Sequence, residues 1–283
     1  MDAAWSADER PVVGIVDPNV EAGPSDGAES LEDALRPTLD AHDATAVGGD
    51  AADVLAGSPS VLVVAGEDAL SAVARRRPDV PVLPVGDVTG IDAVDLDRLP
   101  AALEAVLEGD ARIHRHPILG LEVEDRGDAA GRGSTGDAAD SVERDGAREY
   151  ALFDATLVTD EPARISEYGV SSRGESVATF RADGVVIATP AGSHGYASAV
   201  DAPHLSAAVD AVAVAPIAPF VTQTRRWVLP DDDLAVTVER DEGDVRLVAD
   251  GRSVATVDVD SRVTIAVDGA LETLSVPDGV LES

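Results

Sequence analysis

The first 115 residues alternate short apolar runs with amphipathic segments, and this alternation constrains the fold more than any other feature. Apolar, strand-like runs occupy residues 11–17, 44–47, 60–65 and 80–85. Helical patterns, with apolar residues three or four positions apart, occupy residues 28–41, 50–55, 66–76 and 99–107. Strands separated by helices predict a parallel, doubly wound sheet, in which ligands bind at the carboxyl ends of the strands.

From residue 116 onward the pattern changes to strands with few helices between them. Such strands predict a β-sandwich. We therefore expect an N-terminal α/β domain at residues 1–115 and a β-sandwich domain at residues 116–268. The last segment, residues 269–283, is a candidate to return to the first domain. Residues 125–149 are rich in Gly, Ala, Asp and Arg, and are expected to form a mobile loop between two strands.

Composition excludes several classes of function. The chain has 21 basic and 54 acidic residues, a net charge of −33, no cysteine and no lysine. Nucleic acids and anionic membranes need basic patches, so neither is an expected partner. Without cysteine, disulfides and cysteine-ligated zinc are excluded. Without lysine, a Walker phosphate loop and Schiff-base chemistry are excluded. Without an apolar run of about 18 residues or a basic-then-apolar start, we expect a cytoplasmic protein.

The dense carboxylate charge predicts adaptation to high salt. Molar salt shortens the screening length to about 3 Å, which suppresses the repulsion between surface carboxylates. We therefore expect the chain to lose structure on dialysis from molar salt into dilute buffer, measured by circular dichroism. An unchanged spectrum in dilute buffer would contradict this expectation.

One stretch of the second domain has the composition of a ligand site. Residues 181–203 read RADGVVIATPAGSHGYASAVDAP. A charged turn leads into the apolar strand 185–188, and small and hydroxylic residues follow as far as Tyr196. Small residues let a ligand approach backbone N–H groups, while hydroxyls and one aromatic ring can hold polar and flat groups. A tight connection without a ligand is the alternative interpretation.

This stretch resembles the hallmark of the NAD kinase family, in which an Asp-Gly pair and an apolar strand precede a Thr-Pro-x-Gly-Ser-x-x-Tyr loop. The matching residues are Asp183, Gly184, Thr189, Pro190, Gly192, Ser193 and Tyr196. The family usually has Thr-Ala before the tyrosine, where this chain has His194 and Gly195. The resemblance implies an NAD pocket lined by Asp183, Thr189, Ser193, Gly195 and Tyr196. Arg181 is a candidate phosphate cation or a surface residue, and His194 is a ligand contact or a polar loop residue.

A second match, at Gly66-Glu67-Asp68-Ala69-Leu70, follows the most apolar strand. The family carries Gly-Gly-Asp-Gly-Thr at such a strand end, so the resemblance implies that Gly66 and Asp68 belong to a phosphate loop. It also implies that Asp68 is the catalytic base for the ribose 2′-hydroxyl. Two glycines and the threonine of the motif are replaced here. The local alternative is that Asp68 only caps the helix that follows.

Further matches follow in the family's order. Asp154 stands at the acidic position that holds the NAD ribose in the family, although Phe153 replaces the preceding Asn. The alternative interpretation of Asp154 is an exposed residue on a surface strand. A Pro-Ile-x-Pro segment occurs at residues 216–219, and an Asp-Gly turn occurs at Asp250. Two other features have simpler interpretations. Residues 48–50 are expected to form a helix-capping loop. His114 and His116 lie on a strand that is expected to be exposed, and no third metal ligand is suggested for them.

The resemblance implies phosphoryl transfer from ATP to the 2′-hydroxyl of the NAD adenosine ribose, giving NADP. It implies Mg²⁺ or another divalent metal as cofactor, ATP or polyphosphate as donor, and a homo-oligomer of two or four chains. The alternative is a catalytically impaired, NAD-binding regulatory relative, because the Gly-Gly-Asp-Gly motif is degraded. A hydride-transfer enzyme is disfavoured because no Gly-x-Gly-x-x-Gly follows the first strand.

Overall fold

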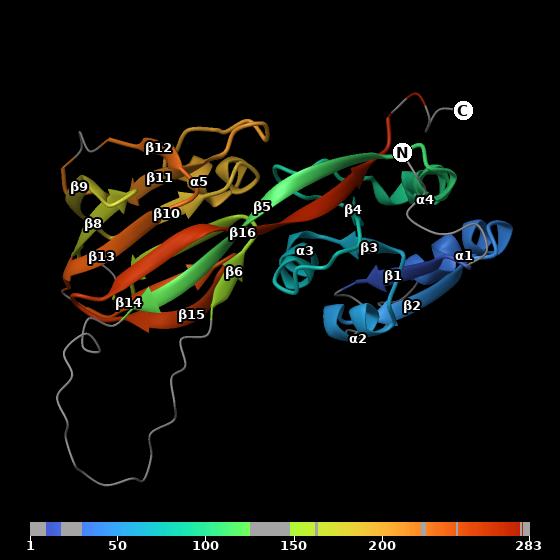
Figure 1. Cartoon of the computed structure of the whole chain (residues 1–283), viewed down its shortest axis with the longest axis horizontal. Coiled ribbons are helices and arrows are strands. Elements are labelled where there is room, and N and C mark those ends of the chain that lie inside the picture. Colours follow the sequence, from blue (N-terminus) through green and yellow to red (C-terminus); the bar gives the residue numbers. More distant parts are fainter. Residues whose placement is uncertain are drawn as a thin grey trace, which may run out of the picture. The chain divides into compact units, whose positions relative to one another are not determined.

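The computed structural model describes residues 10–17, 30–124, 148–161, 164–221, 225–241, 243–277 and 279. The chain divides into two compact units, one of residues 1–117 with 269–283 and one of residues 118–268. Strands β5 (Arg112–Glu124) and β16 (Arg262–Ser275) each begin in one unit and end in the other (Figure 1). Most of the expected mobile loop, residues 125–147, lies outside the described residues.

The first unit is built on a parallel sheet. Its strands run in the order β2-β1-β3-β4, and the end of β16 pairs parallel with β4 at Thr273 and Val82. These four strands are β1 (Val12–Val16), β2 (Thr45–Gly49), β3 (Val61–Ala65) and β4 (Val82–Val85). The helices are α1 (Leu31–Ala41), α2 (Ala51–Ala56), α3 (Glu67–Ala74) and α4 (Leu99–Glu108), with the 3₁₀ turn η1 (Leu96–Arg98).

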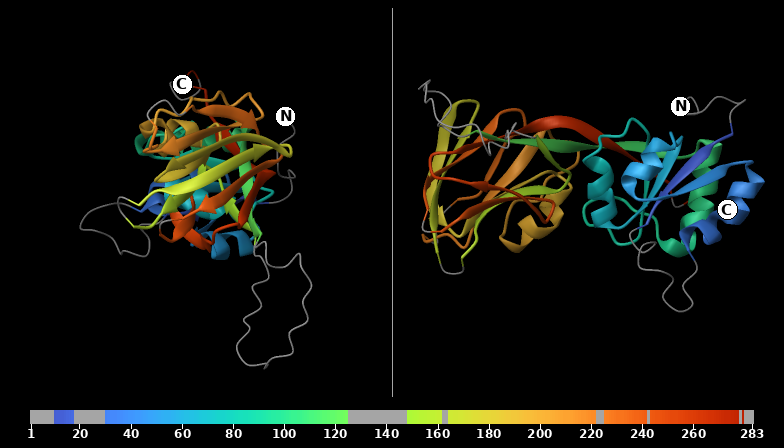
Figure 2. Two further views of the ribbon diagram at one scale, coloured as in Figure 1. Left: turned by 90° about the vertical axis from the view of Figure 1, so that its left-hand side faces the viewer. Right: turned by 90° about the horizontal axis from the view of Figure 1, so that it is seen from below.

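Helices cover both faces of this sheet (Figure 2). Val13 and Ile15 of β1 share one apolar cluster with α1 and α4. Gly14 points the other way, and a Cβ there would meet the Val54 side chain of α2 at 2.5 Å. Because side chains alternate across a strand, β1 packs on a helix layer on each side. The predicted doubly wound α/β fold is therefore confirmed.

The second unit contains two antiparallel sheets. One has the strand order β12-β11-β10-β7-β14-β15, and the other contains β16-β13-β8-β9 with β5 and β6. The strands not yet placed are β6 (Glu149–Ala151), β7 (Asp154–Thr159), β8 (Ser166–Ser172), β9 (Glu175–Ala182), β10 (Gly184–Ala188), β11 (Ala211–Ile217), β12 (Trp227–Pro230), β13 (Leu234–Arg240), β14 (Val245–Ala249) and β15 (Arg252–Val257). Two short helical turns, η3 (Gly192–His194) and α5 (Tyr196–Ala199), follow β10.

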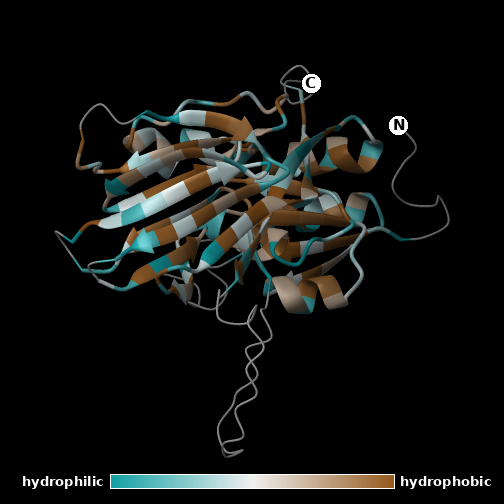
Figure 3. Cartoon of the chain, turned by 60° about the vertical axis from the view of Figure 1, so that its left-hand side comes forward, coloured by the Kyte–Doolittle hydropathy of each residue, from teal (hydrophilic) through white to brown (hydrophobic). Residues whose placement is uncertain are grey.

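The core of the second unit lies between its two sheets. Leu157, Ile187 and Val214 of one sheet and Tyr168 and Val236 of the other belong to a single buried cluster. Hydropathy alternates along many of these strands (Figure 3), because each strand turns one row of side chains to this core. The expected sandwich is therefore confirmed.

The prediction of an exposed His114–His116 strand is wrong for His116. The His116 ring is only 5% exposed, and its Nε2 lies 3.0 Å from the Thr273 hydroxyl. Burial, followed by the nearby His114, lowers the pKa of His116 to about 4, so this ring is neutral at pH 7. By contrast, the capping loop expected at residues 48–50 is confirmed. The Asp50 carboxylate accepts from the amides of Ala52 at 2.7 Å and Asp53 at 2.9 Å.

Within the described residues, no helix is long and apolar enough to cross a membrane.

Candidate functional site

Three segments of the six-stranded sheet meet at one end. Asp154 at the start of β7 pairs with Ala188 at the end of β10, and Ala155 pairs with Ala249 at the end of β14. The loop after β10 and the turn after β14 therefore lie beside the residues that lead into β7. Antiparallel pairing produces this convergence, because the start of one strand lies beside the ends of its two neighbours.

The Asp250 carboxylate binds these segments together. It accepts from the backbone amides of Leu152 at 2.8 Å, Phe153 at 2.8 Å and Asp154 at 3.1 Å. The Asp250 amide in turn donates to the Asp154 carbonyl at 2.9 Å. Asp250 (φ 46°) and Gly251 (φ 74°) form the two-residue turn between β14 and β15, where Asp-Gly suits the left-handed backbone. One turn therefore fixes the backbone from residue 152 to residue 154.

Asp154 lies in an unusual electrostatic setting. Burial and, after it, the nearby Asp250 charge raise the pKa of its carboxyl to about 6, while a hydrogen bond from Thr156 acts in the opposite direction. Perturbed carboxyls of this kind occur often at functional sites, although structural networks also produce them. Asp154 can offer two acceptor oxygens to a pair of ligand hydroxyls.

Two hydroxyls predicted to contact a ligand are bound within the protein. The Thr189 hydroxyl donates to the carbonyl of Leu152 at 2.8 Å, and the Gly192 amide donates back to it at 3.2 Å. The Ser193 hydroxyl donates to the Pro190 carbonyl at 2.7 Å and accepts from the Leu205 amide at 2.9 Å. Both side chains are fully buried. In this structure they shape the loop, and a direct contact with a ligand stays a prediction.

Gly192 lies where the packing leaves no room for a side chain. A Cβ at this position would lie 1.9 Å from the Phe153 carbonyl oxygen. The loop after β10 therefore packs directly on the backbone that Asp250 holds. At Gly195 the nearest atom to an added Cβ is 3.5 Å away, so this glycine has more room.

The same loop carries exposed ring side chains. Tyr196 is 51% exposed, and His194 is exposed two residues before it. The His204 ring lies 4.7 Å from the His194 ring, between centroids. The Ser193–Leu205 hydrogen bond holds the two chain segments together below these rings. The loop and the segment around His204 therefore together present three rings that can stack on or donate to a ligand.

Arg181 and Asp183 are not brought to this end. Asp183 precedes β10, where its carbonyl accepts from Thr159 and its amide donates to Ile217. The six residue-to-residue steps from Asp183 to Thr189 correspond to about 20 Å along an extended strand. The Arg181 guanidinium lies over the Phe220 ring, 5.8 Å from its centroid. An NAD-binding role for Arg181 and Asp183 stays a prediction.

Asp68 lies in the first unit, and the alternative that it caps helix α3 is wrong. Gly66 is the N-cap with φ 81°, no side chain caps the helix, and Asp68 is an exposed residue of the first turn. The Glu67 carboxylate accepts a hydrogen bond from the Thr89 backbone amide at 2.7 Å. Ala69 is 5% exposed and Leu70 is fully buried, so two of the three replaced motif positions belong to the core.

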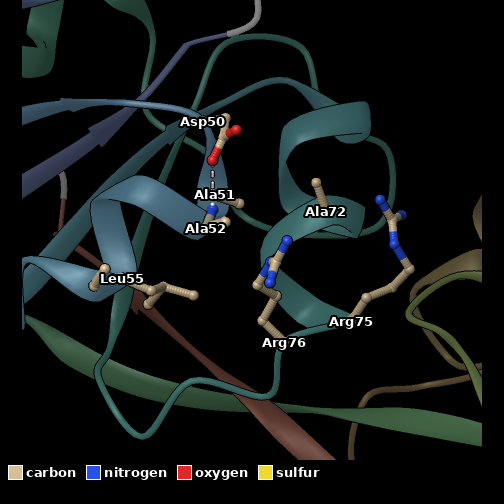
Figure 4. A pocket seen from close by; sticks show the side chains of 8 residues that line it. Asp50, Ala51, Ala52, Leu55, Ala72, Arg75 and Arg76 are labelled. Carbon is tan, nitrogen blue, oxygen red and sulfur yellow. Dashed lines mark hydrogen bonds between the residues drawn. The ribbon is translucent and has the colours of Figure 1, made fainter.

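A separate groove of about 780 Å³ lies between α2 and α3 (Figure 4). Small and apolar side chains line it, together with Asp50, Arg75 and Arg76. None of the predicted site residues belongs to it.

Sequence reasoning identified the Asp250-Gly251 turn but missed its function as an anchor. Asp250 lies 96 positions from Asp154 in the sequence, and no local pattern reports which backbone a turn carboxylate will meet. His204 was also missed. The available signal was its position shortly after the loop that contains His194.

The Asp154→Asn substitution tests this electrostatic setting. Because the folded-state pKa is raised, Asp154 contributes most to stability below about pH 4, and the contribution is lost as the pH rises through about 6. Between pH 4 and 7, the unfolding free energy of the wild type should fall relative to Asp154→Asn by up to about 3 kcal/mol. Denaturant titrations at each pH measure it, with the exposed Asp258→Asn as control. A difference that does not change with pH would refute the assignment.

The comparisons with known proteins agree on one family. Residues 153–271 match the family model of the ATP-NAD kinase C-terminal domain. The chain is 28% identical to the NAD kinase of Pseudomonas fluorescens over 186 residues, which cover 64% of this chain and 57% of the relative. It is 31% identical to that of Methanosarcina barkeri over 118 residues, 41% of this chain and 43% of the relative. It is 27% identical to that of Geotalea daltonii over 230 residues, 80% and 75% of the two chains.

The matched parts thus span about half the length of the first two relatives. Two solved structures share the fold. A yeast NADH kinase complexed with NADH has a TM-score of 0.72 at 15% identity, covering 97% of this chain and 86% of that one. An NAD kinase from Archaeoglobus fulgidus in complex with ATP has a TM-score of 0.68 at 17% identity, covering 96% and 98%. The motif order, the match of residues 153–271 to the C-terminal domain model and the low identities together show that the chain is similar to NAD kinases and divergent from them.

Proposed function

We propose that the protein is an NAD kinase, which transfers a phosphoryl group from ATP to the 2′-hydroxyl of the NAD adenosine ribose. The observation that carries the proposal is Asp154, whose backbone is held by the Asp250 carboxylate and pairs with Ala188 just before the loop of residues 189–196, inside the segment that matches the family model. An acceptor with two oxygens, held next to exposed rings, suits a ribose diol attached to a flat base.

NAD binding is assigned to two kinds of residue. Asp154 accepts from the ribose hydroxyls, while Tyr196 and His194 supply rings that stack on or donate to the ligand, and Gly195 leaves room for it. Thr189 and Ser193 act through the shape of the loop, because their hydroxyls are already hydrogen-bonded.

The reaction requires a base for the 2′-hydroxyl. Asp68 accepts this proton as the hydroxyl oxygen attacks the terminal phosphorus, and the bond from that phosphorus to the ADP oxygen breaks. General-base catalysis of this kind contributes roughly 10²–10⁴ in rate. ATP enters as its complex with Mg²⁺ or another divalent metal, whose charge offsets that of the phosphates. The hydrogen bond from Thr89 gives the neighbouring Glu67 carboxylate a partner within the protein.

The alternative is an NAD-binding relative that no longer transfers phosphate. It rests on Ala69 and Leu70, which are buried in place of the motif's Gly and Thr. This alternative keeps the site of the second unit and loses only the function of the first. A cytoplasmic, salt-adapted homo-oligomer of two or four chains completes the proposal, with polyphosphate as a second possible donor.

The decisive assay measures NADP formation from NAD, ATP and magnesium in molar potassium chloride. We expect product from the wild type, and a rate lower by about 10²–10⁴ for Asp68→Asn with NAD binding intact. The matched control is Asp97→Asn, an exposed carboxylate of the same unit, which should keep the full rate.

Each other result has a defined meaning. A wild type that binds NAD but forms no product with ATP or polyphosphate would establish the non-catalytic alternative. Equal rates for the wild type and Asp68→Asn would remove Asp68 from the mechanism. A wild type that does not bind NAD would refute the site itself.

A further inference from the structure

His42, Glu104 and Glu108 form a mixed imidazole–carboxylate cluster in the first unit. Each offers one potential metal-ligand atom, and the three atoms lie within 4.8 Å of one another. Glu104 and Glu108 are one helical turn apart on α4, so their side chains emerge from the same face. His42 directly follows α1. We propose that this cluster is a binding site for a divalent transition-metal ion that joins the ends of α1 and α4.

The packing of the two helices fixes the cluster. Leu35 and Leu39 of α1 share one buried cluster with Leu99 and Leu103 of α4. The Thr38 hydroxyl, one turn before His42, contacts the Pro100 carbonyl at 3.5 Å. The imidazole therefore comes from a backbone whose position relative to α4 is set by the core beneath it.

The backbone of His42 is also held. Its amide donates to the Thr38 carbonyl at 3.2 Å and closes the last turn of α1. The ring is partly buried, whereas Glu104 and Glu108 are exposed. An ion at this cluster would therefore have one ligand on a held backbone and two on exposed side chains.

The electrostatics of the helix ends favour a cation. Helix C-termini carry partial negative charge, and a cation nearby is stabilising. Neither α1 nor α4 has a basic residue in its last turn. Glu108 is the last residue of α4 and adds a full negative charge at such an end. The net charge of −33 adds to the attraction.

The donor set indicates the class of ion. One imidazole nitrogen with two carboxylates suits zinc and related first-row divalent ions, whereas Mg²⁺ and Ca²⁺ prefer oxygen ligands alone. Three protein ligands leave at least one coordination position for water. The inference does not depend on kinase activity, because these residues belong to neither part of the proposed catalytic apparatus.

The test is a titration of the full-length, metal-free chain with Zn²⁺ by calorimetry at molar potassium salt, which screens diffuse binding to surface carboxylates. We expect one ion per chain in a step that excess Mg²⁺ does not compete away. His42→Ala and the double variant Glu104→Gln/Glu108→Gln should each weaken this step at least tenfold. Zn²⁺ should also raise the thermal midpoint of the wild type and not that of these variants.

Two control variants distinguish Zn²⁺ binding at this cluster from binding to surface charge in general. Asp95→Asn/Asp97→Asn removes two exposed carboxylates of the same unit, and His114→Ala removes an exposed histidine of β5. Both should bind as the wild type does. Circular dichroism establishes that every variant is folded. Binding that is unchanged in His42→Ala, lost equally in the Asp95/Asp97 control, or present only as many equivalent weak sites would overturn the proposal.

Discussion

The hydrogen bonds from three consecutive amides to the Asp250 carboxylate are the interaction on which the candidate site depends. They connect a hairpin turn to the start of a neighbouring strand, and the loop after β10 then packs on the same backbone. A carboxylate bound by several amides holds a rigid backbone, because each of these charge-assisted bonds is stronger than a neutral one. The same carboxylate places a negative charge beside Asp154 and helps to raise its pKa. Rigidity and electrostatic tuning thus have one source.

Much of the fold could be predicted from the sequence because it follows from local patterns. The β-branched runs at residues 61–65 and 184–188 and the helical spacing of Leu31, Leu35 and Leu39 each report a buried face directly. Along the sequence, strands separated by helices give way to strands alone, and this change also indicated an α/β part followed by a β-sandwich part. The site loop was recognisable because small and hydroxylic residues directly follow a strand.

The internal geometry of the site could not be read in this way. A pattern cannot tell whether a hydroxyl faces a ligand or the backbone, and Thr189 and Ser193 both face the backbone. Sequence proximity grouped Asp183 with Thr189, although β10 carries the chain from one end of the sheet to the other between them. At the start of α3, Gly66 takes the capping position that Asp68 could have held. In each case a long-range contact or a strand direction decides the outcome.

The two units preserve the family pattern to different degrees. In the second unit, the divergent positions His194 and Phe153 leave the Asp250 anchor and the site loop intact. In the first unit, Leu70 and Ala69 have become part of the core. This contrast separates the two parts of the proposal: dinucleotide binding rests on residues of the second unit, and phosphate transfer rests on Asp68 of the first.

The most direct test of the central claim is the affinity for NAD of the wild type and of Asp250→Asn, measured by calorimetry in molar potassium chloride. Asparagine tolerates the left-handed backbone at this position but offers one acceptor oxygen in place of two. We predict an NAD affinity lower by about tenfold or more for Asp250→Asn, with the circular dichroism spectrum unchanged and Asp258→Asn binding as the wild type does. Equal affinity in a folded Asp250→Asn variant would contradict it.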